Sequence, residues 1–350
     1  MRPQLVVGPG ALVAVLLLTT VLGTSFTVAA QARAGRVLER APLTTTTAAP
    51  TAPLADPPAA EVAAPPTTTA PTTSTTVPQP RFTMEPYRGL GAWFDVYDWT
   101  TSFARYNPAL EVDAIDTLAA QGVQTLFIQA SKWDSPTDVV DEPRFLAFVD
   151  RAHQLGISVV AWYLPTLIDP GRDVRRLLAI AKTPVDGLAI DIEGRNVADV
   201  AERNLRLTQV SRAVRAALPG AVIGAIPLEP VLMEDINPSY WPGFPWAAIA
   251  SSYDVWLPMG YWTNRRADSP WRNAFAYTAV NIDRLRARIG QPDAPIHALG
   301  GIGDLTTQSD MQGFYEAALD RGAIGGSIYD FRTTTGPLWP KLLPFRGLRQ

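Results

Sequence analysis

The sequence contains no cysteine and only two histidines, His153 and His297, in 350 residues. Without cysteine there is no disulfide framework, no thiolate nucleophile and no cysteine-ligated metal. Two histidines are too few for a histidine-rich zinc site and leave few candidate bases for a Ser-His-Asp triad. We therefore expect no metal and no cofactor. His297 opens an apolar run and is expected to be structural, and His153 to lie on a helix surface.

An excess of either charge is also missing. Lysine and arginine number 30 and aspartate and glutamate 33, which gives a formal net charge of -3. Nucleic-acid binding needs clustered basic side chains to neutralise phosphates, so we expect no nucleic-acid partner. Apolar residues make up 47% of the chain, which is enough for a large core that needs no disulfides.

Residues 1–32 have the pattern of a targeting segment. A basic residue, Arg2, precedes an apolar run at 11–22, and Ala30-Gln31-Ala32 follows. This order is typical of a cleaved secretory signal peptide. A membrane anchor is the alternative, because residues 5–30 are long enough to cross a hydrocarbon core of about 30 Å. Either way we expect export, to a secreted or extracellular location or to the membrane surface.

Residues 33–80 are dominated by threonine, proline and alanine, as in the run PPTTT at 65–69. Large apolar side chains are nearly absent, so no burial would offset the entropy lost on ordering this segment. We expect a disordered, semi-rigid spacer. The folded part of the chain is then one domain, residues 81–350, and we expect it to be a monomer.

Residues 81–350 alternate apolar runs with helical patterns, and their number fits a (β/α)₈ TIM barrel of about 250 residues. The expected strands are 89–97, 123–130, 157–164, 185–193, 221–228, 254–261, 295–301 and 325–330. The expected helices are 108–121, 142–155, 172–182, 197–218, 274–289 and 308–321, with an irregular loop at 229–252 and a short helix at 338–343. A doubly wound open sheet is the alternative, but no G-x-G-x-x-G follows the first strand.

The expected strand at 185–193 ends in two carboxylates, Asp191 and Glu193. Residues two apart in a strand share a face, so both should point inward together with Ala189. The carboxyl ends of barrel strands are where active sites form. Two neighbouring carboxylates repel, which raises a pKa and favours a functional site over a simple helix cap or a pair with Arg195.

The other strand ends carry polar and aromatic residues that we expect to bind substrate. Aromatic rings suit the apolar faces of sugar rings, and carboxylates suit their hydroxyl groups. The alternative for each aromatic is ordinary core packing. The sequence therefore predicts a polysaccharide or cell-envelope glycan as the partner. The candidate residues are Asp95, Gln129, Trp162, Glu229, Met259, Trp262, Tyr329 and Asp330.

Residues 186–193, which read DGLAIDIE, resemble the D-G-x-D-x-D-x-E motif of the family 18 glycoside hydrolases, which are chitinase-like TIM barrels. Met259-Gly260-Tyr261 resembles that family's M-x-Y segment, and residues 325–329 resemble its eighth strand. The resemblance implies an exported glycosidase with Glu193 as general acid. It also implies that Asp191 holds a 2-acetamido group whose oxygen attacks the anomeric carbon, and that Tyr261 positions that group.

The chain departs from this family pattern in places that bear on function. Ala189 stands where the family has its middle aspartate, Trp262 where an aspartate often follows the tyrosine, and Tyr329 near a usual tryptophan. These changes leave open a different sugar and a two-carboxylate mechanism in which Glu229 or Asp95 assists Glu193. They also leave open a non-catalytic carbohydrate-binding barrel. A metal-dependent deacetylase is disfavoured by the lack of a histidine cluster.

Overall fold

The computed structural model describes residues 82–104 and 109–349. The predicted signal or anchor at 1–32 and the predicted linker at 33–80 lie outside these residues and stay predictions. Within the described ranges, no helix combines the length and the apolar character needed to cross a membrane.

Eight parallel strands form the centre of the domain, in the order β6-β5-β4-β3-β2-β1-β8-β7. Two isolated bridges, Trp256 to Ile296 and Met259 to Leu299, join the β6 segment to β7 and so bring the two ends of the sheet together. The predicted (β/α)₈ barrel is confirmed as a nearly closed barrel. The strands are β1 (Gly89–Phe94), β2 (Thr125–Gln129), β3 (Ser158–Tyr163), β4 (Gly187–Ile192), β5 (Ile223–Pro227), β6 (Val255–Trp256), β7 (His297–Ile302) and β8 (Gly325–Tyr329).

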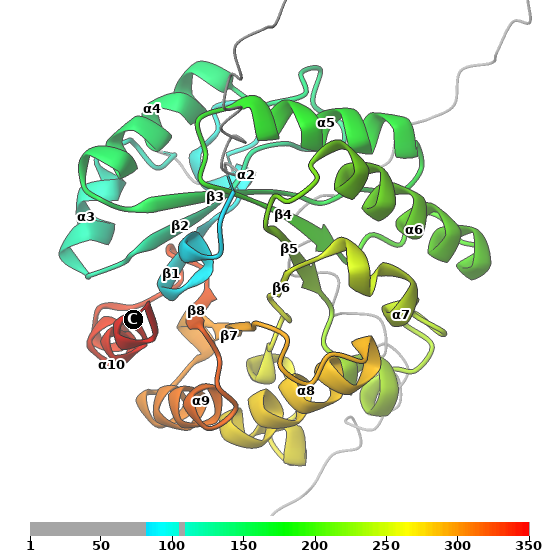
Figure 1. Cartoon of the computed structure of the whole chain (residues 1–350). Coiled ribbons are helices and arrows are strands. Elements are labelled where there is room, and N and C mark those ends of the chain that lie inside the picture. The colour runs from blue at the N-terminus through cyan, green and yellow to red at the C-terminus, as the bar shows by residue number, and fades with distance from the viewer. Residues whose placement is uncertain (1–81, 105–108, 350) are drawn as a thin grey trace, which may run out of the picture. The chain divides into compact units, whose positions relative to one another are not determined.

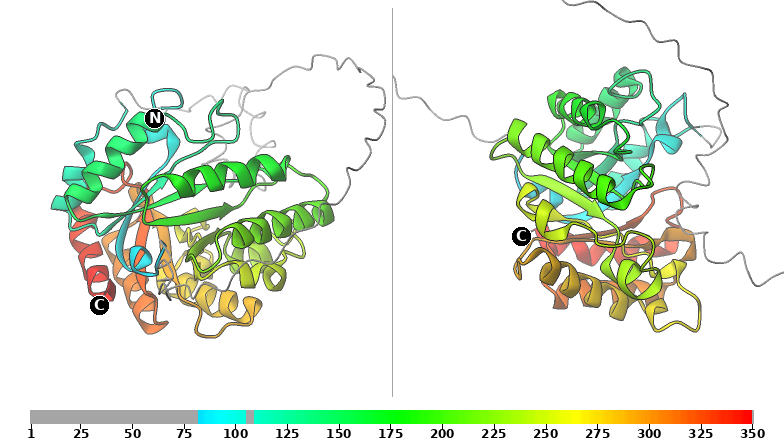
Figure 2. Two further views of the ribbon diagram at one scale, coloured as in Figure 1. Left: turned by 45° about the horizontal axis from the view of Figure 1, so that its top comes forward. Right: turned by 90° about the vertical axis from the view of Figure 1, so that its right-hand side faces the viewer.

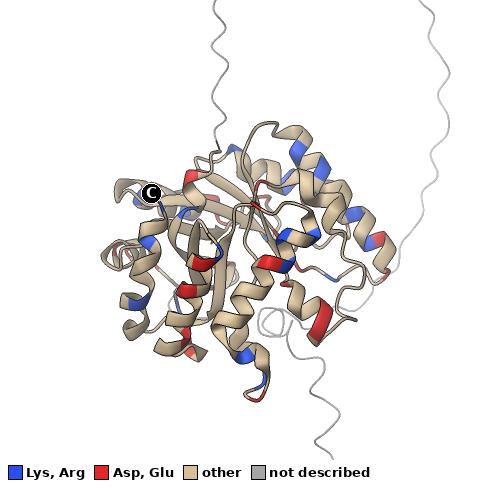
Figure 3. Cartoon of the chain, turned by 60° about the horizontal axis from the view of Figure 1, so that its bottom comes forward, with Lys and Arg blue, Asp and Glu red and all other residues tan. Residues whose placement is uncertain are grey.

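Helices surround the strands and follow one another around the ring in chain order, as seen along the barrel in Figure 1. Figure 2 shows from two further sides that these helices cover the outside of the strands. Both acidic and basic positions occur on the outer helices in the view of Figure 3. The helices are α2 (Val96–Trp99), α3 (Ala114–Ala120), α4 (Glu142–Gln154), α5 (Pro170–Lys182), α6 (Val200–Ala217), α7 (Trp246–Ile249), α8 (Ala274–Ile289), α9 (Gln308–Asp320) and α10 (Trp339–Leu342).

Local sequence signals set where several helices begin and end. The side chains of Asp169, Asp199 and Asn273 each accept a hydrogen bond from the backbone N–H three residues later, at the starts of α5, α6 and α8. Such caps satisfy amides that have no partner within the helix. Gly290 ends α8 with φ of +69°, a left-handed conformation that glycine adopts at little cost. The predicted range 274–289 is confirmed for α8, whereas α5 begins two residues earlier and α6 three residues later than predicted.

His297 is the first residue of β7 and is fully buried near the amino-terminal ends of the barrel strands. Its Nδ1 is 2.8 Å from the carbonyl oxygen of Tyr87, and its Nε2 is 2.9 Å from Oγ of Ser327. A carbonyl only accepts, so Nδ1 donates, and the neutral ring accepts at Nε2 from the Ser327 hydroxyl. Burial lowers the pKa of His297 to about 4. The ring is thus a neutral part of the core.

Some elements differ from the predicted ranges for local chemical reasons. The predicted strand at 254–261 pairs regularly only over Val255–Trp256, because Pro258 has no N–H to offer a neighbouring strand. The predicted strand at 89–97 stops at Phe94, because the side chain of Asp95 caps α2. Of the predicted helix at 108–121, the described residues 109–121 are helical over Ala114–Ala120.

The two segments expected to be irregular or short are so. Residues 229–252 contain a π-helical turn at Leu232–Ile236, the four-residue α7 and a 3₁₀ turn at Ala250–Ser252, instead of one long helix. The expected short helix at 338–343 is α10, which continues into a 3₁₀ segment at Leu343–Arg349. The barrel therefore has eight strands although two of its connections contain only short helical segments.

Candidate functional site

Strand β4 carries Asp191 and Glu193 to the carboxyl end of the barrel. Both side chains are nearly buried, at 7% and 8% exposure. The residue after Glu193 must be glycine, because a Cβ on Gly194 would lie 2.5 Å from the carbonyl oxygen of Pro165. The turn that follows β4 is thus pressed against the loop that follows β3. This packing holds the two acids in a fixed place relative to their neighbours.

The surroundings of the pair favour its protonated forms. Burial raises the pKa of Asp191 well above its usual value, and the charge of Glu193 adds to the effect. Burial likewise raises the pKa of Glu193 to about 7, with the negative charge of Glu229 adding to the shift and Arg195 opposing it. Glu193 can therefore carry a proton near neutral pH, which is what a general acid requires.

Tyr261 lies at the same end of the barrel as these acids, on the segment that follows β6. Met259 fixes this segment through bridges to Leu228 and Leu299 on either side. Burial raises the pKa of Tyr261 well above its ordinary value, and the charges of Glu193 and Asp191 contribute next. Tyr261 therefore lies within reach of the charges of both acids, at the carboxyl end of the barrel. The catalytic roles of these three residues stay predictions.

Glu229, two residues beyond β5, belongs to the same group of acids. The hydroxyl of Tyr277 donates to its Oε1 at 2.6 Å, and Nη2 of Arg265 lies 3.8 Å from that oxygen. Burial raises the pKa of Glu229, while Arg265 acts against the rise. Neither Tyr277 nor Arg265 can be singled out from the sequence, since Tyr277 reads as a core residue of a helix and Arg265 lies in an irregular loop.

Among the buried side-chain atoms without a hydrogen-bond partner in the described residues, three come from neighbouring strands at this end of the barrel. They are Nε1 of Trp162, Oδ1 of Asp191 and Oε2 of Glu229. They come from β3, β4 and the end of β5, which are neighbouring strands. A buried polar atom without a partner costs about 1–3 kcal/mol. One indole N–H and two carboxyl oxygens in this arrangement fit a ligand rich in hydroxyl or amide groups.

A second group of polar residues faces the first across the barrel and comes from β1 and β8. The hydroxyl of Tyr329 donates to Oδ2 of Asp95 at 3.0 Å. The ring of Tyr329 lies 6.0 Å from the ring of Tyr261, which connects the two groups. Asp330 contributes to the raised pKa values of both tyrosines. Asp95, Tyr329 and Asp330 therefore surround the same end of the barrel as Glu193.

Asp95, Asp98 and Asp330 form the one acidic group, among residues 82–104 and 109–349, that is dense enough to consider as a cation site, with carboxylate oxygens within 4.8 Å of one another. Their oxygens already accept hydrogen bonds from the backbone N–H groups of Tyr97, Asp95 and Thr333. Burial, reinforced by the other two carboxylates, raises the pKa of Asp98 to about 9. These contacts shape the ends of β1 and β8, and we assign no metal to them.

The remaining predicted substrate-binding residues have structural contacts. The amide of Gln129 accepts from the backbone N–H of Val96 and donates to the carbonyl of Ser131. Met259 is 3% exposed and part of the barrel wall. Trp262 is completely buried, with its ring 5.1 Å from the ring of Phe314 of α9. The placement of Trp262 does not support the predicted role, because its stacking surface is used in the core.

Comparisons with known proteins find similar structures but no similar sequence. No protein-family model matches the chain, and no curated protein matches it. The spore cortex-lytic enzyme SleL of Bacillus cereus is similar in structure, with 12% identity, a TM-score of 0.55, and 74% of each chain covered. The endo-1,4-β-mannanase of Rhizomucor miehei shares 10% identity at a TM-score of 0.54, over 75% of this chain and 94% of that one.

A GH18 chitinase of Cycas revoluta, solved as a variant in complex with (GlcNAc)₄, gives a TM-score of 0.53 at 10% identity. The match covers 75% of this chain and all of that chain. At such low identities the likeness shows a shared barrel fold. It does not by itself carry an activity over to this chain, because one barrel fold supports many chemistries.

Proposed function

We propose that this chain is a glycoside hydrolase acting on a polysaccharide, with Glu193 as the general acid. The observation that carries the proposal is the buried pair Asp191 and Glu193, with a pKa of about 7 for Glu193, at the carboxyl end of β4. In the reaction, Glu193 gives its proton to the glycosidic oxygen as the bond between that oxygen and the anomeric carbon breaks. The leaving sugar then departs as a neutral alcohol.

Asp191 and Tyr261 assist Glu193 in the proposed reaction. In the mechanism that the family 18 resemblance implies, the acetamido oxygen of the substrate attacks the anomeric carbon, Asp191 binds the acetamido group, and Tyr261 positions it. Water then attacks the anomeric carbon, the bond to the acetamido oxygen breaks, and Glu193 takes up a proton from that water. The unpartnered Oδ1 of Asp191 is a suitable acceptor for such a group. Because position 189 is alanine and not a third acid, we also propose an alternative two-carboxylate mechanism, in which Glu229 or Asp95 serves as the second carboxylate.

The structural neighbours support a polysaccharide as the substrate class, since their names describe a cortex-lytic enzyme, a mannanase and a chitinase. The N-terminal sequence supports work outside the cell. Residues 1–32 have the pattern of a signal peptide or membrane anchor and residues 33–80 that of a spacer. We include both in the proposal: an exported barrel, either released or held at the membrane surface.

The test is release of reducing ends from soluble chitin, mannan and peptidoglycan fragments by the full-length protein. Glu193→Gln keeps the size of the side chain but has no proton to give, so it should lower turnover at least about a hundredfold. Glu316→Gln, on the exposed surface of α9, is the matched control and should act like the wild type. Undiminished turnover by the Glu193 variant would remove this residue as the acid.

A non-catalytic carbohydrate-binding barrel is the second candidate, and Ala189 is the observation that favours it. This residue is fully buried and level in the sheet with Trp162 and Gly224, where it adds no acid to the pair. The candidate predicts saturable glycan binding without turnover. Binding should then survive Glu193→Gln but fall with Trp162→Ala. Turnover that depends on Glu193 would exclude it.

A further inference from the structure

Trp133 is the exposed tryptophan of this protein. All ten tryptophans lie in the described residues; eight are buried and Trp271 is partly buried. Trp133 keeps 43% of its surface exposed. It follows β2 and so lies at the end of the barrel where Asp191 and Glu193 are found. A single exposed apolar side chain is common in proteins, so the loop that carries it has to be considered.

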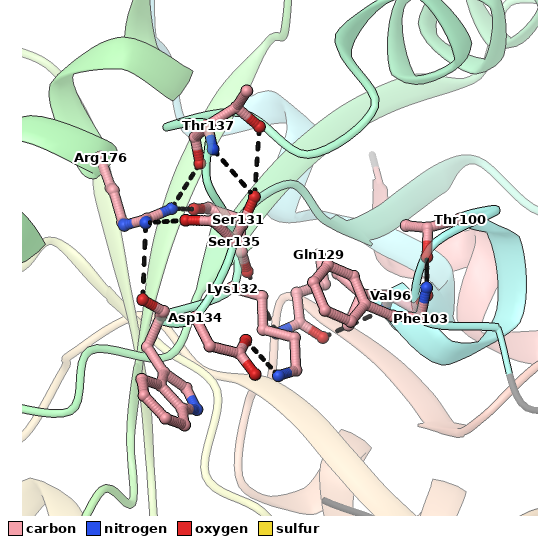
Figure 4. A network of polar contacts seen from close by, with 11 residues as sticks. Val96, Thr100, Phe103, Gln129, Ser131, Lys132, Asp134, Ser135, Thr137 and Arg176 are labelled. Atoms are coloured by element: carbon pink, nitrogen blue, oxygen red, sulfur yellow. Dashed lines mark hydrogen bonds and ion pairs between the residues drawn. The ribbon is translucent and has the colours of Figure 1, made fainter. Parts of the chain in front are cut away.

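A buried arginine holds this loop in one conformation. Arg176 of α5 is 2% exposed, and its guanidinium donates to Oγ of Ser131 at 3.0 Å and to the carbonyl oxygens of Ser135 and Thr137 at 2.7 and 2.6 Å. Figure 4 shows these contacts converging on Arg176 from both sides of the loop. A weaker contact of 3.5 Å reaches the carbonyl of Trp133 itself. Arg176 therefore holds the side chain of Ser131 before Trp133 and the backbone of Ser135 and Thr137 after it.

The side chain of Trp133 also has a fixed neighbour. The ammonium of Lys132 lies 5.5 Å from the centre of the Trp133 ring and 4.7 Å from that of Phe103, and it forms an ion pair with Asp134. Cation–π contacts of this kind hold an aromatic ring in place before a ligand binds. The ring then loses little conformational entropy on binding. A rigid exposed ring is a better stacking surface than a mobile one.

The loop follows a strand that lies two strands away from the acids. Strand β2 is separated from β4 only by β3, and neighbouring strands are about 4.8 Å apart, which places the end of β2 roughly 10 Å from the end of β4. Trp133 lies four residues beyond the end of β2. Trp162 of β3, with its unpartnered indole N–H, lies between these two strands in the sheet. A single sugar bound at Glu193 cannot bridge this distance, whereas a chain of several sugars can.

We propose that Trp133 forms an outer subsite for a glycan chain, where one sugar ring stacks on the exposed indole while another sugar of the same chain occupies the site at Glu193. This inference rests on the proposed function and adds to it a preference for long over short oligosaccharides. The preference follows because only a chain that reaches the β2–α4 loop gains the Trp133 contact.

The test measures binding by calorimetry to full-length protein carrying Glu193→Gln, so that the probes stay intact. The probes are the disaccharide and hexasaccharide of the chitin and of the mannan series. Adding Trp133→Ala should weaken hexasaccharide binding about tenfold and leave disaccharide binding unchanged. Trp133→Phe, which keeps an aromatic ring, should restore most of the loss. Leu319→Ala removes a similarly exposed apolar side chain on α9 and should change neither.

Equal binding of both lengths with and without Trp133 would overturn the subsite while leaving the proposed function intact. An equal loss for disaccharide and hexasaccharide would also overturn it, because Trp133 would then act at the acid or on the fold. Failure of the Glu193→Gln protein to bind any probe, together with no turnover by the wild type, would overturn the proposed function and this inference with it.

Discussion

Glu193 differs from a surface glutamate because it has lost most of its water and has gained a negatively charged neighbour, Glu229. Both effects stabilise its protonated form. Arg195 acts in the opposite direction and keeps the rise in pKa moderate. An acid with a pKa of about 7 is half protonated at pH 7 and mostly protonated below it, and it can still release its proton during the reaction.

The pH dependence of kcat/KM should report this arrangement. Activity needs protonated Glu193, so kcat/KM should fall about tenfold for each pH unit above 7. Glu229→Gln removes the neighbouring charge, which should lower the pKa of Glu193. The alkaline limb of the kcat/KM profile should then move to lower pH. A limb that stays in place, or moves upward, would show that Glu229 does not set the pKa of the acid.

His297 gives a second pH dependence, this one of stability. Its pKa is about 4 in the fold and 6.5 when unfolded, so the unfolded state binds the proton first as pH falls. The contribution of the neutral ring is complete above pH 6.5 and declines toward pH 4, by about 3 kcal/mol in all. In urea unfolding, the stability difference between wild type and His297→Gln should therefore shrink between pH 7 and 4. A constant difference would contradict this account.

At the residue scale, the sequence could identify the acids but not their partners. The spacing of Asp191 and Glu193 after an apolar run is a local signal, and the period of a strand brings both to one face. Arg265 and Tyr277 reach Glu229 across long stretches of chain, from an irregular loop and from α8. Trp262 shows the converse, since nothing in its local sequence tells that its ring packs against Phe314.

At the scale of elements, arginines from the helices hold the loops at the carboxyl end. Arg176 of α5 binds the loop after β2, and Arg206 of α6 donates to the carbonyls of Leu167 and Ile168 in the loop after β3. Each arginine thus comes from the helix that follows the next strand. Helical spacing alone predicts solvated arginines on α6, so this use of Arg206 could not be foreseen from the sequence.

Removal of Arg176 should loosen the loop that it holds. Arg176→Ala leaves the carbonyls of Ser135 and Thr137 without their buried donor, so amide hydrogen exchange at residues 131–139 should become at least about tenfold faster. Arg212→Ala, on the exposed face of α6, is the control and should not change exchange there. Unchanged exchange in the Arg176 variant would show that the loop is held by other contacts.

At the scale of the whole molecule, strand pairing is regular over much of the barrel but sparse between the β6 segment and β7. Strands β1 to β5 pair continuously, and β2 and β3 are matched over five residues. The β6 segment joins β7 only through single bridges, at Trp256 and Met259. Pro258 between them cannot donate a hydrogen bond, which limits regular pairing at this place.

Hydrogen exchange should reflect this difference. The amides of Trp256 and Met259 donate to Pro295 and Pro227 in a region with few neighbouring sheet hydrogen bonds. They should exchange faster than the amides of Phe127 and Ile128 in β2, which serve as the internal reference. Equal protection of both sets would mean that the barrel is closed as firmly at β6 as elsewhere.

The sequence predicts the barrel architecture better than it predicts how the β6 segment pairs with β7. Eight apolar runs separated by capped helices are enough to indicate a (β/α)₈ barrel, because each unit is a local pattern. How closely the first and last parts of the sheet approach depends on contacts such as Met259 with Leu299, which are distant in sequence. Such contacts leave no local signal beyond the proline that shortens β6.

The most direct test of Glu193 as general acid compares two substrates of one sugar series. A natural oligosaccharide has a poor leaving group that needs a proton, whereas a dinitrophenyl glycoside has a leaving group that needs none. Glu193→Gln should lose turnover of the oligosaccharide but hydrolyse the dinitrophenyl glycoside at close to the wild-type rate. An equal loss on both substrates, or no loss on either, would contradict the assignment of Glu193 as the acid.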